Sequence, residues 1–385
     1  MKQQLYELPK GWQWSPLGDV VTLINGRAYK KNELLAEGPT PVLRVGNFFS
    51  NRGWYYSDLE LPSEKYCEEG DLLYAWSASF GPKIWNGPRA IFHYHIWKIE
   101  TSNVIDKYYL RWLLEFDSKR IKAQGNGVAM AHATKGSMEK HQIPLPPLNE
   151  QKRIVAKLDA LFTRIDTAIS HLQEILELSR ALFASALIDS FEKNPAWKSM
   201  QIKDVFTVIN GRAYKKPELL ESGKYPVVRI QNLKGGDAYY YSDLELKADK
   251  YCMHGDLLFS WSGTPGTSFG AFIWEGRKSI FHYHIWNMKP LIEIDHRFAY
   301  WLLRDLTEVA IANSRGVAGM LHITKGMMES FDVEIPPIEK QAQIAVKLDT
   351  LSERNRTLEV TTQEKLNDLT ALKASLLDAA FRGQL

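Results

Sequence analysis

Cysteine is scarce in this sequence: the 385 residues include only two, Cys67 and Cys252. They occupy equivalent positions of an internal repeat, so we expect buried thiols in a reducing cytoplasm rather than a mutual disulfide. No apolar run follows Met1, and the sequence has no run of about 18 apolar residues. The sequence therefore supports neither export nor a membrane span, and we expect a cytoplasmic protein.

Signatures of catalysis are missing as well. No glycine-rich loop for a nucleotide or methyl donor follows a predicted strand, no Asn-Pro-Pro-aromatic tetrapeptide occurs, and no Asp/Glu/Lys nuclease cluster recurs. A strong charge imbalance is also lacking, since 48 Lys and Arg face 45 Asp and Glu, for a net charge of +3. We expect a non-catalytic protein, in which any DNA binding depends on local clusters of cations.

What the sequence does contain is a long internal repeat. Ile24–Lys31 (INGRAYKK) returns unchanged as Ile209–Lys216, Tyr55–Leu61 returns as Tyr240–Leu246, and Phe92–Trp97 returns as Phe281–Trp286. Solenoid units comprise only tens of residues, so this repeat is a duplicated domain. We place the two copies at residues 1–147 and 194–337.

Each copy is followed by a stretch without proline or glycine, which predicts long helices over 148–193 and 338–385. Apolar residues of the first helix recur in three adjacent heptad series, a face wide enough for a sister helix and a further partner. In the second helix Asn355 and Thr362 replace apolar residues, and such polar residues tend to fix register. We expect the helices to pair antiparallel as a spacer. The predicted spacer and partner interface comprises Leu158, Leu161, Phe162, Ile165, Ile169, Leu172, Leu176, Leu348, Leu351, Leu358, Leu369 and Leu376.

Within each copy the pattern indicates a mixed α/β domain. Residues 20–24, 42–45, 72–76 and 92–99 are rich in β-branched and aromatic residues and predict strands, with a turn at Asn25-Gly26. Helices are predicted over 106–123 and 295–312, each with an Asp where the N-cap lies.

Several repeated side chains suit contact with DNA. The INGRAYKK segment combines three cations and a tyrosine, and Arg44 and Asn47 have side chains that bond guanine and adenine edges. The alternatives are a solvated loop and structural hydrogen bonds. Trp76-Ser77 can offer a ring and a hydroxyl, or pack in the core. The predicted DNA-binding residues are Arg27, Tyr29, Lys30, Lys31, Arg44, Asn47, Trp76, Ser77, Lys135, Arg212, Tyr214, Lys215, Lys216, Arg229, Gln231, Asn232, Trp261, Ser262 and Lys325.

Two histidine-containing segments allow more than one interpretation. His93 and His95, repeated as His282 and His284, have the i, i+2 spacing of metal ligands on one strand face, but no third ligand is evident, so we expect no metal. The loop from His132 to Gly136 holds Lys135, which can meet a phosphate or simply mark the start of a helix.

Further motifs carry a family resemblance. Leu8–Trp12 (LPKGW), Gly70–Leu73 (GDLL) and above all Ile143–Gln151 (IPLPPLNEQ) resemble the DNA specificity subunit of type I restriction-modification systems. The second copy repeats the last motif as Ile335–Gln341 (IPPIEKQ), with Lys340 where the first copy has Glu150. The resemblance covers essentially the whole chain.

The resemblance implies that each copy is a target recognition domain for one half of a bipartite site in double-stranded DNA, with the helices setting the gap. It implies that the chain binds no cofactor. Two methylation subunits, which bind S-adenosylmethionine, dock on it, and restriction subunits that use ATP can join. Because the copies are nearly identical and related by an approximate two-fold, we expect an interrupted near-palindrome. The alternatives are a bivalent binder of another ligand such as carbohydrate, consistent with 12 Trp and weak net charge, and an enzyme in its own right.

Overall fold

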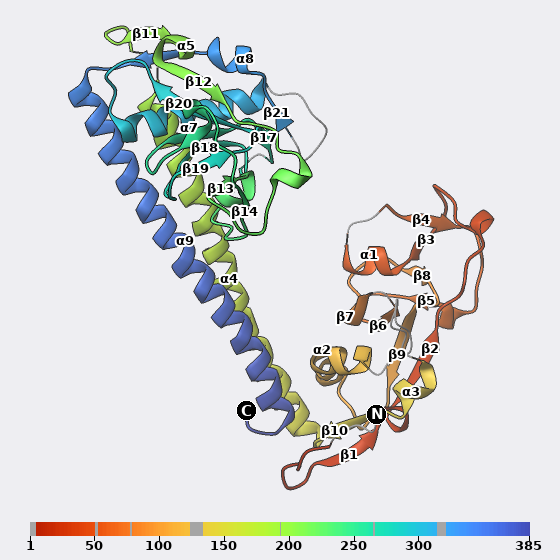
Figure 1. Cartoon of the computed structure of the whole chain (residues 1–385). Coiled ribbons are helices and arrows are strands. Elements are labelled where there is room, and N and C mark those ends of the chain that lie inside the picture. The colour runs from red at the N-terminus through yellow and green to blue at the C-terminus, as the bar shows by residue number, and fades with distance from the viewer. Residues whose placement is uncertain are drawn as a thin grey trace. The chain divides into compact units, whose positions relative to one another are not determined.

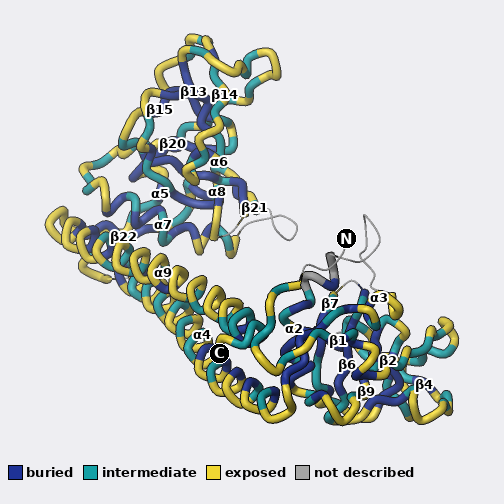
Figure 2. Tube along the Cα trace, turned by 90° about the horizontal axis from the view of Figure 1, so that it is seen from below, coloured by how far each residue is buried: buried dark blue, intermediate teal, exposed yellow. Residues whose placement is uncertain are grey.

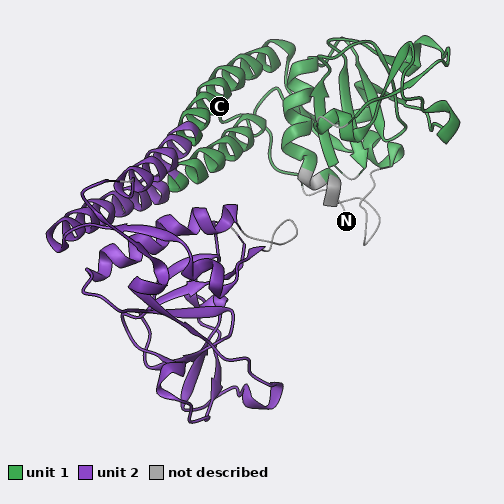
Figure 3. Cartoon of the chain, turned by 90° about the horizontal axis from the view of Figure 1, so that it is seen from above, with its two compact units in different colours: residues 1–173, 363–385 green, residues 174–362 purple. Residues whose placement is uncertain are grey.

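The protein forms two compact units, each made of one repeat and parts of both long helices. The computed structural model describes residues 5–50, 53–77, 79–123, 134–192, 194–264, 266–313 and 321–385. The first unit comprises residues 1–173 and 363–385, and the second comprises 174–362 (Figure 3). No helix among the described residues is long and apolar enough to cross a membrane.

The first unit contains two four-stranded sheets and a two-stranded ribbon (Figure 1). The sheet orders are β2-β9-β6-β7, wholly antiparallel, and β4-β3-β8-β5, in which β3 and β8 run parallel. Strands β1 and β10 form the ribbon. The elements are β1 (Gln13–Pro16), β2 (Val21–Asn25), β3 (Thr40–Leu43), α1 (Val45–Phe49), β4 (Tyr55–Ser57), β5 (Tyr66–Cys67), β6 (Leu72–Ser77), β7 (Ser79–Ile84), β8 (Ala90–Phe92), β9 (Ile96–Thr101), α2 (Lys107–Ala123), α3 (Lys135–Glu139), β10 (Gln142–Leu145) and the start of α4 (Leu148–Ser190).

The second unit repeats this topology. Its sheets have the orders β12-β20-β16-β18 and β14-β13-β19-β15, and β11 pairs with β22. The elements are β11 (Lys198–Gln201), α5 (Ile202–Val205), β12 (Phe206–Asn210), β13 (Tyr225–Val228), α6 (Ile230–Leu233), β14 (Tyr240–Ser242), β15 (Tyr251–Cys252), β16 (Leu257–Ser260), β17 (Ser262–Gly263), β18 (Gly270–Ile273), β19 (Ser279–Phe281), β20 (Ile285–Pro290), α7 (His296–Ala312), β21 (Leu321–His322), α8 (Lys325–Glu329), β22 (Asp332–Ile335) and α9 (Ile338–Phe381).

The core of the first domain follows the two-residue period of strand β6. Leu72 and Tyr74 pack in one apolar cluster with helix α2, whereas Leu73 and Ala75 pack in another with residues of the second sheet. Side chains of a strand alternate between its two faces, so β6 contributes to both cores. These sheets and helices together confirm the predicted mixed α/β fold.

The predicted medium-length helices are confirmed as α2 and α7, and an aspartate caps each. Asp106 Oδ1 accepts from the backbone N–H of Tyr109 at 3.0 Å, and Asp295 Oδ1 accepts from that of Phe298 at 2.8 Å. Such caps satisfy N–H groups that have no partner within the helix. One predicted strand is wrong: residues 92–99 divide into β8 and β9, with a turn at His93–His95.

The long helices begin at Leu148 and Ile338, where the sequence without proline is predicted to become helical. Each unit contains one segment of each helix, and the two segments pair antiparallel. In the first unit Lys373 Nζ donates to Asp166 Oδ1 at 2.6 Å. In the second, Ser179 Oγ donates to Asn355 Oδ1 at 2.5 Å. The polar residue Asn355 thus faces the sister helix as expected.

The less exposed residues of these helices recur at alternating intervals of three and four residues. Figure 2 shows exposed and less exposed residues alternating along α4 and α9. Leu158, Phe162, Ile165 and Leu348 are buried, and Leu161, Ile169, Leu172, Leu176, Leu351, Leu369 and Leu376 are partly buried. Leu358 does not belong to this set, because 40% of it is exposed while Asn355 and Glu359 take the less exposed positions. A strict a/d stripe is narrower than the three-series face that the sequence indicates.

Two polar side chains bind each globular domain to the start of its long helix. Gln151 is fully buried at the start of α4, where its Oε1 accepts from Asp106 N at 2.7 Å and its Nε2 donates to Pro146 O at 2.8 Å. About two turns further along, Asp159 accepts from Trp112 Nε1 at 2.8 Å. Gln341 with Asp295 and Asp349 with Trp301 repeat both contacts in the second unit. These bonds explain why glutamine and aspartate follow each Pro-Pro element.

Candidate nucleic-acid interface

The repeated INGRAYKK segment begins at the end of strand β2. It continues past the turn at His93 and does not itself form a turn at Asn25-Gly26. Gly26 N donates to Ile96 O at 3.2 Å and Arg27 N donates to Phe92 O at 3.0 Å. A Cβ atom on Gly26 would lie 2.4 Å from the carbonyl oxygens of Phe92 and His93, so only glycine fits. The predicted turn at Asn25-Gly26 is therefore wrong, and the glycine serves close approach of two backbones.

Two of the predicted contact residues of this segment are engaged inside the domain. The Arg27 guanidinium makes a bidentate pair with Glu33, at 3.0 and 2.8 Å, which lowers the pKa of Glu33 and raises that of Arg27. Tyr29 Oη donates to Phe92 O at 3.3 Å, and burial raises the pKa of this phenol. Arg212 with Glu218, and Tyr214 with Phe281, repeat these bonds. DNA contact by these four side chains would have to compete with internal bonds.

The lysines that end the segment differ from Arg27 and Tyr29, because they are exposed to solvent. Lys30, Lys31, Lys215 and Lys216 are all exposed, and no ion pair of theirs is recorded among the described residues. A flexible ammonium in solvent suits a phosphate oxygen better than a base edge. They remain predicted phosphate contacts.

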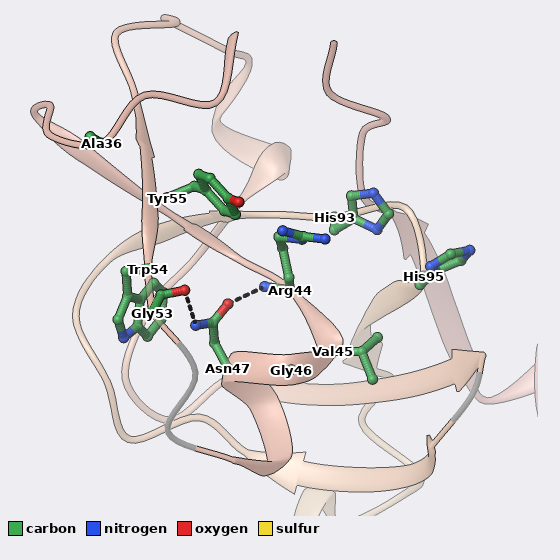
Figure 4. Close-up of a pocket in the computed structure, with 10 residues that line it drawn as sticks. All are labelled: Ala36, Arg44, Val45, Gly46, Asn47, Gly53, Trp54, Tyr55, His93 and His95. Atoms are coloured by element: carbon green, nitrogen blue, oxygen red, sulfur yellow. Dashed lines mark hydrogen bonds between the residues drawn. The ribbon is translucent and has the colours of Figure 1, made fainter. Parts of the chain in front are cut away.

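Arg44 lies at the centre of a pocket of 830 Å³ in the first domain (Figure 4). It occupies the N-cap position of α1, and its guanidinium lies 5.1 Å from the centre of the Tyr55 ring. Figure 4 shows it between Tyr55 and His93, with His95 beyond. The pocket is lined by Ala36, Arg44, Val45, Gly46, Asn47, Gly53, Trp54, Tyr55, His93 and His95.

The two histidines of this pocket lie in a turn and do not project from one strand face, because Ile96 N bonds back to His93 O at 2.9 Å. Their ring centres are 4.9 Å apart. Burial, His95 and Arg44 together lower the pKa of His93 to about 4. His93 is therefore neutral at pH 7, and Arg44 supplies a positive charge to the pocket. No group of three metal-binding side chains occurs in the part of the chain that the structure describes.

The second domain builds the same arrangement from its own residues. Arg229 lies 5.4 Å from the Tyr240 ring centre, and burial, His284 and Arg229 lower the pKa of His282 to about 4. Asn232 is buried: its Oδ1 accepts from Arg229 N at 2.9 Å, and its Nδ2 donates to Gly236 O and Ala238 O. The structural-bond alternative thus holds for Asn232. Asn47 likewise accepts from Arg44 N at 3.4 Å and donates to Gly53 O at 3.3 Å.

Tryptophan and serine at the end of β6 face different ways. Trp76 is partly buried, stacks on Trp97 with ring centres 5.5 Å apart, and donates from Nε1 to Tyr94 O at 2.9 Å. It thereby supports the histidine turn, and Trp261 repeats this with Tyr283. Ser77 and Ser262 are buried, so the expectation of hydroxyls offered to a ligand does not fit the structure.

The lysines after the loop begin short helices. Thr134 and Thr324 cap α3 and α8, and Lys135 and Lys325 pair with Glu139 and Glu329 one turn later, at 3.7 and 3.4 Å. The helix-start interpretation of this motif is confirmed, and the predicted phosphate contact stays a prediction. His132 lies outside the described residues.

Comparison with known proteins gives the family of this duplicated domain. The family model described as "Type I restriction modification DNA specificity domain" matches residues 9–178 and again 194–368. The chain belongs to this family. The two DNA specificity domains therefore account for both repeats and for most of the two long helices.

Relatives with this domain occur in bacteria and archaea. The chain is 24% identical to the type I restriction enzyme EcoKI specificity subunit of Escherichia coli K12, over 98% of this chain and 90% of that protein. It is 27% identical to the MjaVIII specificity subunit of Methanocaldococcus jannaschii, over 60% of this chain and 58% of that protein. Nothing among these relatives favours a carbohydrate-binding protein or a free-standing enzyme.

Solved structures show the same fold. A chain from a structure of a type I restriction-modification system aligns with a TM-score of 0.80 at 22% identity, covering 99% of this chain and all of that one. The HsdS subunit from Thermoanaerobacter tengcongensis aligns over both full lengths with a TM-score of 0.60 at 21% identity. The mixed α/β fold with long helices is thereby confirmed.

The depressed histidine pKa values in the two DNA specificity domains predict an acid-sensitive fold. Unfolded histidine has a pKa of 6.5, whereas His93 and His282 titrate at about 4 when folded. Between these values the unfolded chain binds more protons, so these groups lower stability as pH falls from about 6.5 to 4 and have no effect above. Thermal unfolding at pH 7.5, 5.5 and 4.5 should show a smaller acid-induced fall in Tm for His93→Gln/His282→Gln than for the unchanged chain. Equal falls would contradict the assignment.

The sequence alone does not indicate the roles of some residues of the DNA specificity domains. Glu33 follows Arg27 by six residues, and nothing in the local pattern indicates that it takes up the guanidinium. Tyr55, which backs Arg44, belongs to a repeated segment, and that identity was the only available signal. Gln151 and Asp159 belong to a recognisable sequence motif, but their hydrogen bonds to the globular domain are evident only from the packing of α4.

Proposed function

We propose that the chain is the sequence-specific DNA-binding subunit of a type I restriction-modification complex, in which each domain reads one half of a bipartite site. Family membership carries the DNA-recognition role. Two copies of one arrangement of side chains, around Arg44 and around Arg229, support two similar half-sites. The expected recognition sequence is an interrupted near-palindrome in double-stranded DNA.

The similarity of the half-sites rests on the residues that surround each arginine. Arg44, Asn47, Tyr55, His93 and His95 all have identical counterparts in the second domain. Those counterparts are Arg229, Asn232, Tyr240, His282 and His284. Domains that present the same groups from the same elements should favour the same bases, as the two halves of a dimeric reader do on a palindrome.

The proposed partners are methylation subunits, two per chain, with restriction subunits as possible further members of the complex. S-adenosylmethionine and ATP would then bind to these partners. An exposed apolar stripe supports docking on α4: Ile175, Leu178 and Leu182 are 42%, 62% and 69% exposed at helical spacing. Exposed apolar rows of this kind suit the apolar face of a partner helix.

The decisive experiment recovers the complex and its target together. The tagged chain is purified from its native cells, and the eluate is tested for methylation of random-sequence DNA. Any modified sites are then sequenced. We expect a methylation subunit in the eluate and a two-part motif whose halves are inverted and nearly alike. Two unrelated halves would overturn the near-palindrome, and a chain without partner or methylation would overturn the proposed function.

A further inference from the structure

We propose that both half-sites contain a guanine, read by Arg44 and by Arg229, and that Gln231 adds an adenine requirement to the second half-site alone. This inference rests on the proposed function, since it names the bases that the same two pockets read. It makes the site a near-palindrome with one defined asymmetry.

The first step concerns which arginine of each domain is available. Arg27 and Arg212 form bidentate pairs with glutamates, whereas no ion pair of Arg44 or Arg229 is recorded among the described residues. Each of the latter lies over a tyrosine ring, a contact that uses none of its N–H donors. The donors of Arg44 and Arg229 thus stay directed to a ligand rather than to a carboxylate of the same domain.

The second step concerns base against phosphate. Phosphate sites gather several cations, but among the described residues Arg44 is the one lysine or arginine in the lining of this pocket: His93 has its pKa lowered to about 4, and Asn47 is uncharged. A single planar guanidinium in neutral surroundings matches the two acceptors of guanine, O6 and N7. The exposed lysines Lys30 and Lys31 lie outside the lining of this pocket and suit phosphates.

The third step removes asparagine as an adenine reader and introduces glutamine. The Asn232 amide is consumed by bonds to Arg229 N, Gly236 O and Ala238 O. Gln231 is exposed, and its Nε2 donates to Ala238 O at 3.1 Å. An amide has two N–H groups and an oxygen, so one donor and the acceptor remain for the N7 and N6 edge of adenine.

The fourth step is the difference between the domains. Gln231 stands where the first domain has Gly46, and Ala238 stands where it has Gly53. Both glycines line the pocket of the first domain, so the amide of the second domain spans a place that is open in the first. The backbone before it is alike, with φ −117° and ψ 162° at Arg44 and φ −116° and ψ 167° at Arg229. Other lining positions differ as well, with Ala36, Val45 and Trp54 replaced by Glu221, Ile230 and Tyr239, but among these replacements Gln231 alone adds an amide.

The test compares motifs selected from a random double-stranded DNA library by the affinity-purified complex of the full chain. For the arginines we expect Arg44→Met, which removes the charge and the donors, to lower the guanine preference about 5- to 150-fold in one half only, and Arg229→Met to do so in the other. Uniform weakening on all sequences, with a shallower salt dependence, would instead identify phosphate contacts and overturn the guanine assignment.

The glutamine is tested by a reciprocal exchange. Gln231→Gly should remove the adenine requirement and make the halves alike, whereas Gly46→Gln should add it to the first half. Gly46→Ala is the matched comparison, because it adds a side chain without an amide and should not add the adenine requirement. Motifs that ignore both exchanges would overturn the role of Gln231. Failure of the proposed function is distinct, since it would yield no two-part motif for the unchanged chain.

Discussion

Replacing His141 by phenylalanine is expected to destabilise the first domain by about 3–5 kcal/mol, although the second domain has a phenylalanine at the same place. His141 Nε2 lies 3.0 Å from Asp117 Oδ2, and both side chains are at most 2% exposed. The substitution leaves the carboxylate of Asp117 buried without the imidazole. Removing one partner of a buried polar pair is among the more costly single changes in a protein.

The second domain shows that an apolar pair satisfies the same packing. Leu306 and Phe331 stand at the positions of Asp117 and His141, and both line a small cavity of 160 Å³ between α7 and β22. Replacing a buried polar pair by apolar side chains of similar volume is often neutral or stabilising. The double variant Asp117→Leu/His141→Phe should therefore recover the stability that His141→Phe loses.

Hydrogen exchange at the amides of β2, β9 and α2 measures this effect in the first domain alone, because a global melt of two domains does not separate them. Protection should fall in His141→Phe and return in the double variant. The matched exchange in the second domain, Leu306→Asp, should reduce protection there by a similar amount. A double variant as unstable as His141→Phe would show that the aspartate and histidine act through other partners.

The architecture could largely be predicted because its signals are local. Freedom from proline and glycine marks α4 and α9, and their starts at Leu148 and Ile338 agree with it. Exact identity of segments marks the duplication. The width of the helix face could not be predicted in the same way, because the helices pair through alternating three- and four-residue steps that leave Leu358 exposed.

The candidate site was less predictable, because its chemistry depends on contacts distant in sequence. A run of β-branched and aromatic residues over 92–99 suggests one strand, yet His93–His95 turns to meet Arg27 from far earlier in the chain. Arg27 and Arg44 look equally suited to DNA in the sequence. Only the fold shows that Glu33 takes up Arg27 while a tyrosine ring backs Arg44.

Replacing Gly26 by alanine is expected to cost about 3 kcal/mol and to abolish recognition of the first half-site. The new Cβ would lie 2.4 Å from two backbone oxygens of the histidine turn, which cannot rotate away as a side chain can. The turn must move, and it carries His93, whose imidazole lines the pocket of Arg44.

The contrast between two glycines separates this close-approach effect from a general effect of alanine. Gly136 in α3 has nothing within 4 Å of a Cβ position, so Gly136→Ala should be neutral or stabilise by up to about 1 kcal/mol. Urea unfolding and selection of DNA sites measure both variants. Gly26→Ala should keep the second half-site motif while losing the first, and Gly211→Ala should do the reverse, because its Cβ would lie 2.2 Å from His282 O. If Gly26→Ala unfolded no more easily than Gly136→Ala, the close approach of Gly26 to the histidine turn would not limit stability. Direct DNA contact would then be the better explanation for the identity of INGRAYKK in the two domains.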